Sequence, residues 1–136
     1  PVHMALSPDG RWAYVLDQQR NSVSRIDILS GSIDAQVRLD YEPNYIIYLE
    51  KRNVLVVSQG IGQSVVALDP ETLDSLTSVS TGLMPAGLAE WDDRYLYIAE
   101  SGSNSVSRTI PRSEPSKPTW QRRSSLTAPP TPCEAS

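Results

Sequence analysis

The residues best suited to binding chemistry are one histidine and a group of tyrosines with an acid beside them. His3 is the single histidine of the chain, and an imidazole titrates near neutrality, so it suits a base, an acid or a metal ligand. Tyr41, Glu42, Tyr45 and Tyr48 follow within a short stretch. An aromatic rim with a carboxylate binds sugars, amines or peptides. We take His3, Tyr41, Glu42 and Tyr45 as candidate ligand- or partner-binding residues; the alternative is packing for the tyrosines and a channel wall for the histidine.

The other polar residues favour structural roles. Asp27 and Asp69 recur at the same position of a repeat, which is typical of aspartates that cap turns. Cys133 is the only cysteine, so the chain cannot form an internal disulfide or a thiolate metal cluster. We find no zinc spacing, no phosphate-binding glycine loop and no nucleophile elbow. The sequence therefore predicts no catalytic residue, no metal and no cofactor.

The elements that must position the candidates come from an internal repeat. Pro1, Pro43 and Pro85 are spaced 42 residues apart, and each opens a short apolar run. A period of this length is typical of a four-stranded propeller blade. Residues 12–16 are apolar on both faces, as in a strand buried between two blades. Residues 33–39 alternate apolar and polar, as in an outer strand with one wet face.

The repeat divides the chain into four segments. We expect blade 1 over residues 1–42, blade 2 over 43–84 and a partial blade 3 over 85–108. Residues 109–136 hold 6 of the 11 prolines, and we expect this Pro/Ser-rich tail to be disordered, since it cannot bury enough apolar surface to offset chain entropy. The predicted fold is all-β: four-stranded antiparallel propeller blades in an incomplete ring, the third lacking its fourth strand.

Two stretches carry a resemblance to a known family. Residues 1–15 read Pro-x-x-Met-Ala-Leu-Ser-Pro-Asp-Gly-Arg-x-x-Tyr-Val, and residues 21–27 read Asn-Ser-Val-Ser-Arg-Ile-Asp. Together they resemble the YVTN-type β-propeller repeat, and the likeness extends over residues 1–108. Such repeats are found in surface-layer and periplasmic proteins, which implies an extracytoplasmic location. Related propellers include quinoprotein dehydrogenase heavy chains, lactonases and a streptogramin lyase. Residues 49–52, Leu-Glu-Lys-Arg, depart from the Ser-Pro-Asp-Gly turn of the pattern.

The net charge and the hydropathy limit the classes of partner that the chain is expected to bind. The net charge is -4, and an acidic body argues against nucleic acid, whose phosphates need a basic face. No apolar run approaches the ~20 residues of a membrane span. An incomplete propeller leaves its terminal sheet faces uncovered, so we expect missing blades, self-association or another protein as partner.

These observations lead to a non-enzymatic binding or scaffold module from an extracytoplasmic YVTN-like propeller. The first alternative is a fragment of a propeller enzyme, namely a lyase, a lactonase or a quinoprotein dehydrogenase subunit, with its site at the axial mouth near His3 or Glu42. The second alternative places the function in the tail, as a linear motif attached to a propeller fragment.

Overall fold

The computed structural model describes the backbone of residues 3–91, 95–113 and 118–127. Within these ranges the regular secondary structure is β-strand throughout, joined by turns. Three four-stranded antiparallel sheets follow one another in sequence order. Blade 1 contains β1 (Met4–Leu6), β2 (Trp12–Asp17), β3 (Ser22–Asp27) and β4 (Ile33–Arg38). Blade 2 contains β5 (Pro43–Leu49), β6 (Val54–Gln59), β7 (Ser64–Leu68) and β8 (Ser75–Ser80). Blade 3 contains β9 (Pro85–Trp91), β10 (Tyr95–Glu100), β11 (Ser105–Ser113) and β12 (Pro118–Thr127).

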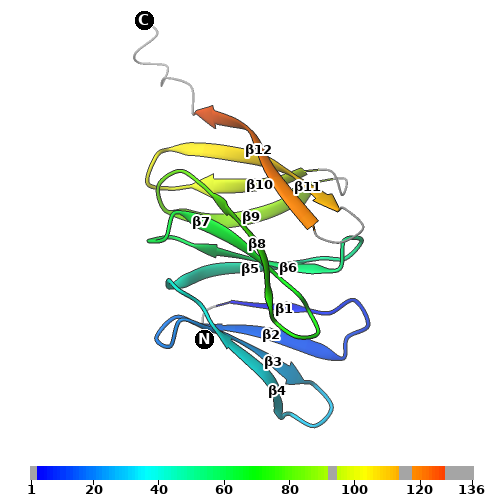
Figure 1. The fold of residues 1–136 in the computed structure, drawn as a ribbon. Coiled ribbons are helices and arrows are strands. Elements are labelled where there is room, and N and C mark those ends of the chain that lie inside the picture. The colour runs from blue at the N-terminus through cyan, green and yellow to red at the C-terminus, as the bar shows by residue number, and fades with distance from the viewer. Residues whose placement is uncertain (1–2, 92–94, 114–117, 128–136) are drawn as a thin grey trace, which may run out of the picture.

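The blades stack face to face, with blade 2 in the middle (Figure 1). The first strands β1, β5 and β9 lie next to one another, which is the arrangement around a propeller axis. We call the face that a blade turns toward the next blade in the chain its front face, and the opposite side its back face. The three sheets do not close into a ring, as the sequence predicts.

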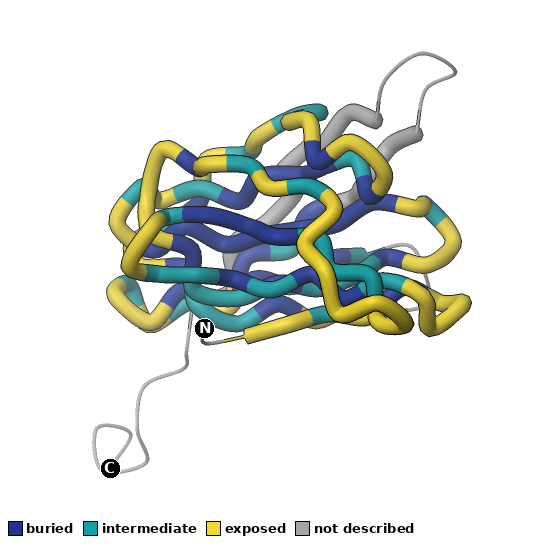
Figure 2. The backbone as a smooth tube through the Cα atoms, turned by 90° about the horizontal axis from the view of Figure 1, so that it is seen from below, coloured by how far each residue is buried: buried dark blue, intermediate teal, exposed yellow. Residues whose placement is uncertain are grey.

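Two apolar clusters join the blades. The first lies between blades 1 and 2 around Tyr14, Leu16 and Leu55, and the second lies between blades 2 and 3 around Val54 and Ile98. Every residue of β6 is buried, because this strand alternates between the two clusters along its length. Figure 2 shows that burial is concentrated in the strands and exposure in the turns.

The repeat is reproduced in backbone detail. Asn21, Gln63 and Asn104 occupy the same turn position and share a left-handed backbone, with φ of 51°, 48° and 57°. Gly31 and Leu73 likewise share a left-handed position in the next turn, with φ of 71° and 63°. Leu73 is 1% exposed and belongs to the first cluster, so packing holds a side chain in a conformation that otherwise favours glycine.

The prediction that the third blade ends at residue 108 is wrong. β11 continues to Ser113, and β12 pairs with it in an antiparallel register and contacts β8. The prolines are tolerated for a physical reason. Pro111 lies beyond Thr109, the last β11 residue that pairs with β10, and Pro118 is the first residue of an edge strand. Proline is tolerated at the first residue of a strand and on edge strands. The predicted disorder of residues 114–117 and 128–136 lies outside the described residues.

Candidate functional site

His3 and Tyr45 meet at the axial side of the stack. His3 precedes β1, and its carbonyl accepts a hydrogen bond from the Leu16 N–H (2.9 Å). Its exposed imidazole lies 4.4 Å from the Tyr45 ring, centroid to centroid, with the planes tilted by 49°. Tyr45 packs its other surface against the cluster between blades 2 and 3. The structure thus brings two of the four candidate residues together across two blades.

The remaining tyrosines point elsewhere. The Tyr41 ring covers Gly62, where an added Cβ would lie 2.4 Å from Tyr41 Cδ2. Glu42 is exposed in the link that follows β4. Tyr48 sits on β5 but lies near Tyr14, with ring centroids 5.9 Å apart. The tyrosine group expected around residues 41–48 is therefore divided between two ends of the blades.

A groove of about 300 Å³ lies between blades 1 and 2 at the end of the sheets that holds the β1–β2, β5–β6 and β7–β8 turns. Its aromatic walls are Trp12, Tyr14 and Tyr48, and its acidic lining residues are Asp9 and Glu71. The complete lining is Ser7, Pro8, Asp9, Trp12, Tyr14, Arg25, Tyr48, Asn53, Pro70 and Glu71.

The fixed element of this groove is a guanidinium stacked on an indole. The Arg25 Cζ lies 3.9 Å from the centroid of the Trp12 ring, well within cation–π range. Its Nε donates to Asp34 (3.0 Å) and its terminal nitrogen to the Pro70 carbonyl (3.1 Å). The Tyr14 hydroxyl donates to the same carbonyl (2.9 Å). Two donors from blade 1 therefore hold the β7–β8 turn of blade 2.

The electrostatic field of the groove is negative around Tyr48. Burial raises the pKa of the Tyr48 phenol, and a group of carboxylates raises it further: Asp9, Asp69, Glu50 and Glu71. Burial, with the neighbouring Tyr48 as a second cause, raises the pKa of Tyr14 to about 12. Tyr48 also donates a hydrogen bond to the Asn53 side chain. Both phenols are thus neutral hydroxyls at ordinary pH.

Asp9 is held in place by hydrogen bonds within the β1–β2 turn, for which the sequence pattern predicts a structural role only. Its carboxylate accepts from the Ser7 hydroxyl (2.5 Å) and from the Arg11 N–H (3.0 Å). The Ser7 hydrogen bond is the main reason that the pKa of Asp9 is lowered, so this carboxylate stays charged at the rim. Sequence reasoning assigned these residues to a hairpin and missed the groove. The available signal was the aromatic Trp12 and Tyr14 pair two strand positions apart, facing an arginine.

A buried carboxylate fixes the link between blades 2 and 3. Glu100, at the end of β10, is 1% exposed. It accepts hydrogen bonds from the Gly82 N–H (2.7 Å), the Ser105 hydroxyl (2.6 Å) and the Ser107 hydroxyl. These donors compensate for the removal of the charge from water.

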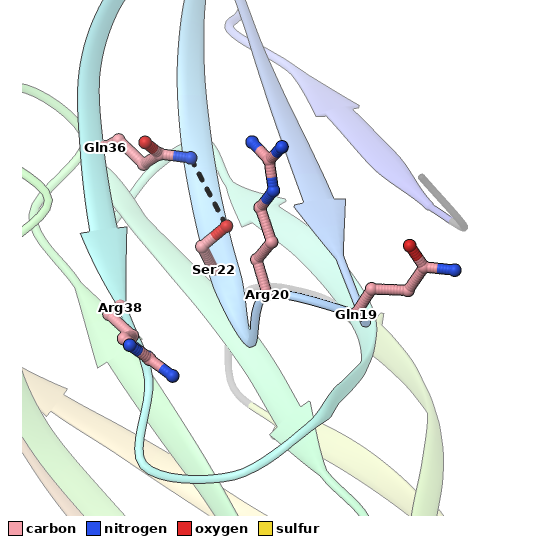
Figure 3. A pocket seen from close by; sticks show the side chains of 5 residues that line it. All are labelled: Gln19, Arg20, Ser22, Gln36 and Arg38. Carbon is pink, nitrogen blue, oxygen red and sulfur yellow. Dashed lines mark hydrogen bonds between the residues drawn. The ribbon is translucent and has the colours of Figure 1, made fainter.

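A second hollow, of about 430 Å³, opens on the back face of blade 1 (Figure 3). Gln36 spans it from β4 and donates to Ser22 (3.4 Å) and Ser24 (3.1 Å) on β3. Arg20 and Arg38 stand on either side of this pair, and Gln19 completes the lining.

Metal and membrane features were sought in the described ranges. There, no group of three or more His, Cys, Asp or Glu side chains is placed to hold a metal ion. In the same ranges, no helix has the length and apolarity that crossing a bilayer requires.

Comparisons with known proteins agree with the architecture. No family model matches the chain, and no curated protein does. Among solved structures, hydrazine synthase of Kuenenia stuttgartiensis superimposes with a TM-score of 0.75 at 23% identity, covering 81% of this chain and 32% of that one. Virginiamycin B lyase of Staphylococcus aureus superimposes with a TM-score of 0.73 at 20% identity, and the match covers 96% of this chain and 41% of the lyase chain. The dihydro-heme d1 dehydrogenase NirN superimposes with a TM-score of 0.69 at 16% identity, and the match covers 88% of this chain and 27% of the NirN chain.

These likenesses define the class of fold. The chain is built of β-propeller blades and spans less than half the length of the propeller proteins it matches. At such identities the similarity concerns the fold alone, and a propeller serves many unrelated activities.

Proposed function

We propose that this chain is a non-enzymatic binding module from an extracytoplasmic YVTN-like β-propeller, and that the groove between blades 1 and 2 is its ligand site. The observation that carries the proposal is the combination of aromatic walls with acidic rim residues, Asp9 and Glu71, around a small cavity. Flat π surfaces and nearby carboxylates together favour a cation. The net charge of -4 attracts the same kind of partner over a longer range.

The groove already binds one cationic side chain of the protein itself. Arg25 is a guanidinium that stacks on Trp12 and pairs with Asp34. A cation from a partner would reach the open part beside Tyr48, between Asp9 and Glu71. A volume of about 300 Å³ is at the lower limit of ligand pockets. It therefore suits a lysine or arginine side chain, or a small amine, rather than a large cofactor.

The test is a titration with model peptides followed by NMR chemical shifts. We expect Gly-Gly-Lys-Gly-Gly to shift the signals of Tyr48 and Asn53, and Gly-Gly-Gln-Gly-Gly to leave them unchanged. Glu71→Gln and Asp9→Asn should each weaken binding on the order of three- to tenfold, more at low salt than at high salt. Glu42→Gln, which changes an exposed acid in the β4–β5 link, is the matched control. Equal binding of both peptides would overturn the assignment.

One observation favours the enzymatic alternative. The His3 ring packs against the Tyr45 ring, with the two planes tilted by 49°, at the axial side, where a propeller lyase, lactonase or quinoprotein subunit would place its site. The neighbour of this imidazole is a phenol ring, whereas a general base is usually oriented by a hydrogen-bonding partner. Lactone or streptogramin cleavage that is abolished by His3→Ala would support the enzyme; absence of turnover would leave the binding module.

A further inference from the structure

The end of the blades opposite the groove carries a group of exposed apolar side chains. The β4–β5 and β8–β9 links and the β6–β7 and β10–β11 turns gather at this end, on the left of Figure 1. Four large apolar residues of these segments are 43% to 67% exposed, and we call them the apolar rim: Tyr41, Ile61, Leu83 and Met84. Apolar side chains that gather on one surface are typical of interaction sites.

The segments of the apolar rim are joined to one another where the three blades of this chain adjoin. The Thr81 N–H donates to the Gln63 carbonyl (2.8 Å), which ties the β8–β9 link to the β6–β7 turn. The Gly102 N–H donates to the Leu83 carbonyl (3.1 Å), which ties the same link to the β10–β11 turn. The Tyr41 ring covers the β6–β7 turn. The rim is therefore one surface and not a set of scattered side chains.

The backbone that presents Leu83 and Met84 is fixed by blade 3. The Met84 carbonyl accepts hydrogen bonds from the N–H and the hydroxyl of Ser101, both at 3.1 Å. Two residues earlier, the Gly82 N–H donates to the buried Glu100 carboxylate (2.7 Å). Met84 has φ of 53°, a left-handed conformation that is uncommon for a long side chain. Such strained backbone is concentrated at ligand clamps and other functional sites.

The two links present their side chains in the same way. Tyr41 and Leu83 hold equivalent positions of the repeat, and each covers the turn glycine of the next blade, Gly62 and Gly102. An added Cβ would lie 2.4 Å from Tyr41 Cδ2 and 2.9 Å from Leu83 Cβ, so glycine makes room for one surface of each side chain. The other surface remains in water, at 47% and 48% exposure. Side chains held in place before binding lose little freedom on binding, which suits anchor residues.

The border of the apolar rim is acidic. Asp40 and Glu42 flank Tyr41 in the β4–β5 link, and both are exposed. In the described segments that form this end, residues 39–45, 59–64, 80–87 and 100–104, every charged side chain is a carboxylate. Arg20 and Arg38, the basic residues nearest to these segments in blade 1, line the hollow on its back face. A complementary partner therefore combines apolar with basic side chains.

We propose that the apolar rim docks an amphipathic segment of a partner protein, with apolar side chains that pack on Ile61, Leu83 and Met84 and with lysine or arginine beside Asp40 and Glu42. Thioether and aliphatic side chains adapt to apolar partners of varied shape. The acidic border disfavours a second copy of this chain in a symmetric contact, because such a contact sets the same acids against each other. The rim and the groove lie at opposite ends of the blades, so this inference is independent of the groove ligand.

The test is a titration of the full chain with two model peptides, followed by the NMR methyl signals of Ile61, Leu83 and Met84. The first peptide is the amphipathic Lys-Leu-Leu-Lys-Lys-Leu-Leu-Lys. The second, Glu-Leu-Leu-Glu-Glu-Leu-Leu-Glu, has the same apolar residues and the opposite charge. We expect the lysine peptide to shift the three methyl signals and the glutamate peptide to leave them unchanged.

Variants at exposed residues separate the apolar contribution from the electrostatic one. Met84→Asn removes the apolar side chain but tolerates the left-handed backbone, and it should weaken binding of the lysine peptide on the order of three- to tenfold. Leu29→Ser, at a 90% exposed residue of the β3–β4 turn, is the matched control at the opposite end and should not weaken it. Glu42→Gln should weaken binding about threefold, more at low salt than at high salt. Asp74→Asn, at an exposed acid of the β7–β8 turn, is its control. Circular dichroism verifies the fold of each variant.

Three results would overturn the proposal. The first is the absence of any shift of the methyl signals of the apolar rim at about 1 mM lysine peptide. The second is equal binding of the two peptides, since the acidic border would then select nothing. The third is a dimer of the chain alone, seen in sedimentation, that Met84→Asn dissociates, because a second copy would then be the occupant of the rim.

Discussion

Tyr14 and Pro70 are joined by a hydrogen bond of 2.9 Å that crosses from blade 1 to blade 2. The phenol of Tyr14 is 1% exposed, and the acceptor is the same carbonyl that receives the Arg25 guanidinium. A single carbonyl in a turn thus closes one end of the interface between two sheets.

Removing the Tyr14 hydroxyl should destabilise the fold modestly. We expect Tyr14→Phe to lower the free energy of unfolding by about 1 kcal/mol, because Arg25 still satisfies the carbonyl. Combining it with Arg25→Met should cost more than the sum of the single changes, since the carbonyl then has neither donor. Urea denaturation measures both. Tyr41→Phe, at a 47% exposed ring, should stay within about 0.5 kcal/mol of the wild type.

The same phenol makes stability fall at alkaline pH. Its pKa is raised to about 12 in the folded chain, against about 10 for an unfolded tyrosine. Between these values the unfolded chain releases the proton and the folded chain keeps it. The contribution of the Tyr14 phenol to the free energy of unfolding is therefore complete below pH ~10 and is lost as the pH rises toward ~12. The total loss is on the order of 2 to 3 kcal/mol. Urea titrations across this window should show the decline, and Tyr14→Phe should flatten it. An unchanged slope in that variant would refute the assignment.

The blades could be predicted from the sequence because each local signal agrees with the period. The apolar run at residues 12–16 became the buried strand β2, and the alternating run at residues 33–39 became the outer strand β4. β12 could not be predicted in this way. An edge strand needs neither a continuous apolar run nor the N–H of every residue, so the composition of a Pro/Ser-rich segment predicts a tail even where the segment forms such a strand.

The site was predicted only in part. His3 and Tyr45 meet because they hold equivalent positions in neighbouring repeats, and that relation is visible in the sequence. The groove depends on turns of different blades approaching each other, and Pro70 and Asp9 are 61 residues apart. No local pattern shows that such turns meet, because their proximity follows from the stacking of the sheets.

Glu100 should be essential for stability in proportion to the donors it satisfies. Glu100→Ala leaves the Gly82 N–H and the hydroxyls of Ser103, Ser105 and Ser107 without this acceptor, so we expect a loss on the order of 3 kcal/mol in the free energy of unfolding. Glu100→Gln should cost less, because one oxygen remains and the hydroxyls can reorient. Asp17→Ala changes the equivalent residue on the open face of blade 1 and should cost under about 1 kcal/mol. If all three variants lose the same free energy of unfolding, the burial of Glu100 beneath the β8–β9 link does not contribute to the stability of the fold.

The fourth strand of blade 3 can be tested by two truncations. Removing residues 118–136 deletes β12, exposes the edge of β11 and takes away the contact with β8. An uncovered sheet edge promotes aggregation, so we expect a lower melting temperature and loss of soluble protein. Removing residues 128–136 keeps β12, and at a concentration where the chain is monomeric it should melt like the full chain. If both truncations melt like the full chain, β12 contributes nothing to the fold, and the third blade ends where the repeat in the sequence ends.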